Sequence, residues 1–71
     1  MELTIKNAIE YVENLTEEGF DVNKAWSDTI DGQHVIRVTF TTVDGYSGEC
    51  IVWEEEDGSL FGEYLLNTTK P

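Results

Sequence analysis

The chain has 71 residues, with fifteen Asp and Glu, four Lys and Arg, and a formal net charge of −11 at pH 7. A chain this short buries only about 60% of the surface that its unfolded form exposes, so we expect one small domain over residues 1–71. The single cysteine excludes an internal disulfide, and no stretch approaches the roughly 20 apolar residues of a membrane span.

The same features predict the compartment and the class of partner. The N-terminal residues lack the basic and apolar regions of a signal peptide, so we expect a cytoplasmic protein. A surface this acidic repels anionic membranes and nucleic acid, which leaves a basic protein as the expected partner.

Apolar residues recur with helical period near the N-terminus and predict a helix over about residues 4–18. Thr4 is the expected N-cap and Gly19 the expected C′ residue. A neighbouring stripe of the helix is acidic apart from Lys6; it comprises Glu2, Lys6, Glu10, Glu13 and Glu17.

After Phe20 the apolar period changes to two, and Asp-Gly occurs three times, at residues 31–32, 44–45 and 57–58. Asp-Gly between alternating runs is a strong hairpin signal, because a type I′ turn needs positive φ at both central residues. The sequence therefore predicts an α+β fold, in which the helix packs on a four-stranded antiparallel meander. The expected strands cover about residues 21–30, 33–43, 46–56 and 59–66.

Two-residue loops at all three turns would determine the strand pairing by counting. The expected pairs between the second and third strands are Ile36–Trp53, Val38–Ile51 and Phe40–Glu49. On the next pairing, Trp53 would cover Gly62. We expect the helix to cover the face that holds Ala25, Ile36, Val38, Phe40, Ile51, Trp53, Tyr64 and Leu66. A three-residue loop with a G1 bulge at any turn would instead reverse the faces beyond it.

The opposite face would mix apolar side chains with carboxylates, whereas the solvent face of a small sheet is normally polar. Val22 and Cys50 are expected on this face, along with the rows Trp26–Arg37–Val52–Glu63 and Asp28–Val35–Glu54–Phe61. Aromatic anchors beside charged residues are typical of protein interfaces, although scattered exposed apolar residues also occur without any partner. These two rows, with Glu56 and Asp57 of the last turn, are the predicted partner-binding residues.

Catalysis and metal binding are not expected. His34 and Cys50 are the only residues of their types, and the expected register places them on opposite faces, with His34 beside Glu55 at a strand end. The run from Glu54 to Asp57 alternates between faces of a strand, so its carboxylates cannot converge on one ion. We therefore predict a protein that is not an enzyme and has no cofactor.

The predicted function is that of a small acidic inhibitor or regulator that binds a basic, nucleic-acid-handling protein, with rows of carboxylates in place of phosphates. In size and acidity the chain resembles, as a class, phage-encoded antirestriction and anti-CRISPR proteins. It shares no family motif with them, so no functional residue carries over. The alternative is a homo-oligomeric structural module that uses the outer sheet face as a dimer interface.

Overall fold

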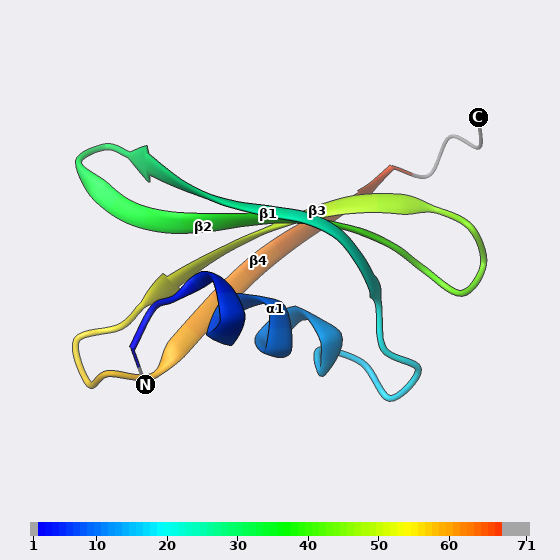
Figure 1. Ribbon diagram of the computed structural model, residues 1–71, viewed down its shortest axis with the longest axis horizontal. Helices are drawn as coiled ribbons and strands as arrows, with labels where there is room; N and C mark the ends of the chain where they lie inside the picture. The colour runs from blue at the N-terminus through cyan, green and yellow to red at the C-terminus, as the bar shows by residue number, and fades with distance from the viewer. Residues whose placement is uncertain (1, 68–71) are drawn as a thin grey trace.

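The computed structural model describes residues 2–67, which form one helix followed by a four-stranded antiparallel sheet in the order β1-β2-β3-β4 (Figure 1). The predicted α+β meander is therefore confirmed. The elements are α1 (Ile5–Glu13), β1 (Asp21–Ile30), β2 (Gln33–Thr41), β3 (Ser47–Glu54) and β4 (Leu60–Asn67).

Helix α1 begins as predicted and ends earlier. Thr4 is the N-cap, and its hydroxyl accepts a hydrogen bond from the Asn7 backbone N–H at 3.1 Å. The helix ends at Glu13 rather than at residue 18, because Asn14 caps it. The Asn14 side chain donates to the Glu10 carbonyl at 2.7 Å and so satisfies one of the terminal acceptors. Gly19, with φ of +75°, therefore lies in the bend before β1 and is not the C′ residue.

The core lies between α1 and one face of the sheet, which we call the inner face. The Phe40 ring stacks on Phe20 with ring centroids 4.2 Å apart, and Tyr64 meets both rings edge-on. Such aromatic pairs add to the stability that their buried area provides. The fully buried cluster consists of Ala8, Val12, Ile36, Val38, Phe40, Cys50 and Val52.

The first hairpin has the predicted two-residue turn. Asp31 and Gly32 have φ of 50° and 80°, as a type I′ turn requires. The predicted pair Trp26–Arg37 is confirmed. Farther along, a β-bulge between Val22 and Lys24 shifts the register. Val22 consequently packs against the core, and its expected place on the outer face is wrong.

The second and third turns have three-residue loops, so the expectation of two residues is wrong at both. At the second turn the Thr42 N–H donates to the Tyr46 carbonyl at 2.7 Å, and the Gly45 N–H donates to the Thr42 carbonyl at 3.0 Å. Only the glycine of this loop has positive φ, which is the pattern of a G1 bulge. The third turn repeats these two bonds with Glu55, Ser59 and Gly58.

Each three-residue loop shifts the pairing by one residue. The observed pairs between β2 and β3 are Ile36–Val52, Val38–Cys50 and Phe40–Gly48. Val52 and Cys50 are therefore buried in the core, and Ile51 and Trp53 point to the opposite face, the reverse of the expectation. The second shift cancels the first for β4, so its alternate residues keep their predicted faces.

The chemistry of Glu49 explains why the shifted register is preferred. The expected register places this carboxylate opposite Phe40, under the helix, where an unpaired charge is strongly unfavourable. The observed register brings Gly48 opposite Phe40 and leaves Glu49 on the outer face. A Cβ on Gly48 would lie 2.6 Å from Phe40 Cζ and 2.8 Å from the Leu65 carbonyl oxygen, so only glycine fits there.

Tyr11 of α1 covers Gly62 of β4, a position that sequence reasoning assigned to Trp53. The Tyr11 hydroxyl accepts a hydrogen bond from the Gly62 N–H at 3.0 Å. A Cβ on Gly62 would lie 2.9 Å from Tyr11 Cε1, so the close approach of the ring requires glycine. This contact attaches the helix to the last strand.

The substitution Gly48→Ala tests the register. We expect it to lower the free energy of unfolding by about 1–3 kcal/mol, because the methyl group overpacks the Phe40 ring and β4 backbone. Urea unfolding measures the change, and Ser47→Ala, at an exposed position of the same strand, is the control. Equal stability of the two variants would contradict the observed pairing.

Candidate protein-binding surface

The sheet face opposite α1 is covered by no other element of the described chain (Figure 1). We call this surface the outer face. One row across all four strands is Trp26–Arg37–Ile51–Glu63, and the aromatic pair Trp53–Phe61 lies beside it. The outer face comprises Lys24, Trp26, Asp28, Val35, Arg37, Thr39, Glu49, Ile51, Trp53, Phe61, Glu63 and Leu65.

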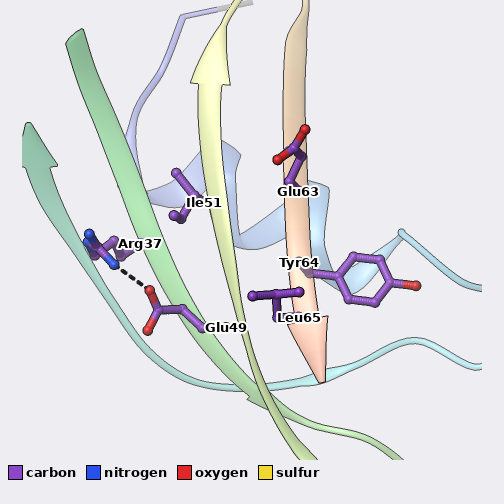
Figure 2. Close-up of a pocket in the computed structure, with 7 residues that line it drawn as sticks. Arg37, Glu49, Ile51, Glu63, Tyr64 and Leu65 are labelled. Atoms are coloured by element: carbon purple, nitrogen blue, oxygen red, sulfur yellow. Dashed lines mark hydrogen bonds and ion pairs between the residues drawn. The ribbon is translucent and has the colours of Figure 1, made fainter. Parts of the chain in front are cut away.

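Arg37 holds two carboxylates at the centre of the outer face. Its Nε donates to Asp28 Oδ2 at 2.6 Å and its Nη1 donates to Glu49 Oε1 at 2.5 Å, the latter drawn in Figure 2. The guanidinium side chain is 28% exposed. Asp28 also accepts the Thr29 N–H, and this bond together with Arg37 lowers the pKa of the Asp28 carboxyl. The two carboxylates in turn raise the pKa of Arg37, so the three charges form one hydrogen-bonded group.

Aromatic and aliphatic side chains surround this group. The rings of Trp53 and Phe61 lie 5.3 Å apart between centroids, and Phe61 is 47% exposed. Trp26 is 39% exposed and Leu65 83% exposed. Val35 is buried although it lies outside the core cluster, and it lines a hollow that Ile51 and Trp53 also line. Partly exposed aromatic side chains at this density are typical of a binding surface.

A hollow of about 670 Å³ opens on the outer face between β2 and β4 (Figure 2). Ile51 lies in its floor, and Leu65 and Glu63 border it on the β4 side. The Arg37–Glu49 ion pair closes the opposite side. The hollow therefore offers an apolar floor with charged groups at its rim.

The structure brings six of the ten predicted site residues to the outer face: Trp26, Asp28, Val35, Arg37, Phe61 and Glu63. Two predictions are wrong in their stated place. Val52 is fully buried in the core, and Glu54 accepts the Leu3 N–H at 3.2 Å at the helix side of the sheet. Glu56 and Asp57, predicted at the last turn, are exposed in the β3–β4 loop.

Sequence reasoning missed three residues of the outer face, namely Glu49, Ile51 and Trp53. All three lie on β3, whose faces were reversed by the loop at Gly45. Glu49 itself was a signal in the sequence that could have found them. A two-residue loop would have placed its carboxylate in the core, which is strongly unfavourable, so a three-residue loop was to be expected.

The carboxylates mostly lie away from the outer face. The face carries Asp28, Glu49 and Glu63 together with Lys24 and Arg37, so it is close to neutral. The remaining twelve of the fifteen acidic residues belong to α1, its flanking segments, the turns and two strand ends, Asp21 of β1 and Glu54 of β3. The expected surface of interleaved carboxylates and apolar groups is thus an apolar surface with an ion-paired centre, and most carboxylates lie elsewhere on the molecule.

The structure corrects the expected surroundings of the single cysteine and the single histidine. Cys50 is fully buried, which corrects its expected place on the outer face, whereas His34 is exposed and lies 3.3 Å from the Ser27 hydroxyl rather than beside Glu55. Between residues 2 and 67, no three His, Cys, Asp or Glu side chains gather around a point that could hold a metal ion. No helix in that range is long and apolar enough to cross a membrane.

Burial raises the pKa of the Cys50 thiol to about 11, which predicts that the native protein resists alkylation. At about pH 8, near the ordinary thiol pKa, few molecules carry the reactive thiolate. We expect iodoacetamide to label Cys50 only as fast as the protein opens, and rapidly in urea. Fast labelling in the absence of denaturant, followed by mass spectrometry, would contradict the burial of this side chain.

The substitution Arg37→Gln tests the ion-paired group. We expect the pKa of Asp28 to rise toward its ordinary value of 3.8, because one of its two main hydrogen-bond donors is lost. Because the pKa of Asp28 is lowered in the folded protein, its carboxylate stabilises the fold at pH values above 3.8. This stabilisation is lost as the pH falls through the lowered pKa. The variant should therefore lose less stability in acid than the wild type does. NMR titration of the Asp28 carboxyl carbon measures the shift.

Lys24→Gln is the matched control for Arg37→Gln, since it removes one positive charge from the outer face outside the ion-paired group. An Asp28 pKa that is equal in both variants would show that the ion pair is not formed in solution.

Comparison with known protein families, with curated proteins and with solved structures finds no match for this chain. No role can therefore be transferred from a relative. Function is inferred instead from the outer face itself and from the distribution of charge on the molecule.

Proposed function

We propose that this protein is a non-enzymatic binding protein that inhibits or regulates a basic, nucleic-acid-handling partner by docking its outer face onto it. The observation that carries this proposal is the uncovered aromatic surface around the Arg37 ion pairs. An apolar centre with aromatic anchors and a charged rim matches the anatomy of protein interfaces. Trp26, Trp53 and Phe61 are the proposed anchors.

The net charge supports a basic partner. Twelve carboxylates lie elsewhere on the molecule, including those of α1 behind the sheet, so they create a long-range negative field around a protein whose docking surface is nearly neutral. Such a field attracts a basic protein and accelerates its association. Proteins that bind nucleic acid carry basic patches, and carboxylates held against such a patch would displace phosphates from it.

The separation of charge from apolar surface assigns different roles to the two groups. The acidic segments set the association rate and its salt dependence, whereas the aromatic anchors set the lifetime of the complex. The chain resembles phage-encoded antirestriction and anti-CRISPR proteins, as a class, in its size and acidity, and the proposed role agrees with that resemblance. We place the protein in the cytoplasm, where such partners act and where a lone cysteine stays reduced.

A second candidate function is self-association through the same outer face. The near neutrality of the face favours it, because two copies can meet there without bringing rows of like charge together. A two-fold contact needs only one self-complementary patch. Light scattering at several protein concentrations separates the two candidates: a stable dimer through this face supports the second, and a monomer excludes it.

The double substitution Trp53→Ala with Phe61→Ala tests the docking surface. The partner is first captured from a lysate of the source organism or its host, identified by mass spectrometry and purified. We expect the double variant to bind it at least about tenfold more weakly, mainly through faster dissociation, because interface aromatics commonly contribute more than 1 kcal/mol each. Ile5→Ala, which removes an exposed apolar side chain from the helix, is the matched control.

Replacing Glu10, Glu13 and Glu17 by Gln should instead slow association and weaken its salt dependence, with little effect on dissociation. Surface plasmon resonance at several salt concentrations resolves the two rates. Unchanged affinity of the aromatic double variant would overturn the proposed docking surface.

A further inference from the structure

Strand β4 forms one edge of the sheet, and the backbone of its second half is open. The Gly62 N–H donates to the Tyr11 hydroxyl, so it points away from β3. Backbone groups alternate in direction along an antiparallel strand, and therefore those of Tyr64 and Leu66 also point outward. Among the described residues, no side chain or loop donates to or accepts from these two backbone positions.

The β4 edge lacks the features that protect edge strands from pairing. Residues 63–67 are all exposed, with Leu65 83% exposed, and Glu63 is the only charged residue of the strand. The strand contains no proline, lysine or bulge. The opposite edge, β1, carries a bulge and Lys24. By the usual rules for edge protection, β4 is the edge available for a further strand.

The charges around β4 indicate which side chains an added strand would carry. Carboxylates line the hollows on both sides of the strand, and the one arginine there, Arg37, is already held by two of them. A second copy of the chain would bring the same carboxylates to the edge, whereas a basic segment would complement them. The acidic residues that line these hollows are Glu10, Glu18, Asp44, Glu49 and Glu63.

We propose that the β4 edge binds an extended, basic segment of the partner protein as a fifth, antiparallel strand. This inference rests on the proposed function and adds to it the form of the recognised segment. The backbone N–H and C=O groups of Tyr64 and Leu66 bond to the segment, as in other complexes formed by strand addition.

The alternation of faces predicts the side chains of the segment. Residues opposite Tyr64 and Leu66 lie on the inner side and are apolar. Residues between them lie on the outer side, where Figure 2 shows Glu63 and Leu65 beside the hollow. Lysine or arginine fits there, because its stem covers Leu65 while its charge meets Glu63. The expected pattern is thus alternating basic and apolar residues.

The probe is an acetylated and amidated peptide of alternating Lys and Val, about six residues long, which matches a typical strand. We expect it to slow hydrogen exchange at the Tyr64 and Leu66 amides, measured by NMR. The matched control has the same sequence and charge with N-methyl groups at the valines, which removes the donors that face β4. It should leave both amides unprotected. Equal protection by the two peptides would overturn strand addition in favour of charge attraction alone.

The substitution Leu66→Pro removes one outward N–H and leaves the bonds to β3 intact, because proline is tolerated where the N–H of an edge strand faces solvent. Leu66→Ala is its control, since it loses the side chain and keeps the N–H. We expect the peptide to bind Leu66→Pro roughly three- to tenfold more weakly than Leu66→Ala, the effect of one hydrogen bond. If Leu66→Pro fails to fold, the N-methylated peptide still decides the question.

The outcomes also separate this inference from the proposed function. Partner capture through the outer face without protection of the Tyr64 and Leu66 amides would overturn strand addition alone. Amide protection by the peptide, with no basic partner captured, would overturn the proposed function alone. Without peptide, the Tyr64 and Leu66 amides could exchange more slowly as the protein concentration rises. That result would show that a second copy occupies the edge, and it would overturn the inference.

Discussion

The close contact between the Phe40 ring and the backbone of Gly48 determines the arrangement of the sheet. Phe20 stacks on Phe40 from the helix side, and Gly48 leaves room for the ring on β3. Any side chain at residue 48 would collide with the ring, and a register shifted by one would place Glu49 against it. The core therefore excludes both alternatives. Every residue on the two faces of β3 takes its position from this contact.

The outer face follows from the same constraint. Once Glu49 is excluded from the core it meets Arg37, and together with Asp28 it neutralises the guanidinium. The shift that brings Glu49 outward also brings Ile51 and Trp53 outward, next to Phe61. A chain of net charge −11 thus presents one nearly neutral, aromatic surface. That separation provides aromatic anchors together with a long-range negative field, a combination that suits protein binding.

The two edges of the sheet differ in how well they are protected from pairing with a further strand. On β1 a bulge and Lys24 oppose further pairing. On β4 the helix protects only the first half, through the hydroxyl of Tyr11. The open half is continuous with the outer face through Glu63 and Leu65, which border the hollow there. A partner could therefore contact the apolar face with its surface and the β4 edge with an extended segment at the same time.

Local patterns in the sequence were sufficient for the fold class, the start of the helix at Thr4, the first hairpin and the faces of β2, because each depends on residues close together in the chain. They also placed on the outer face the six predicted site residues of β1, β2 and β4. The faces of β3 depended on loop length, and Asp-Gly is compatible with loops of two or three residues. Only tertiary packing decided between them, through the room that Phe40 needs opposite Gly48 and the exclusion of the Glu49 charge from the core.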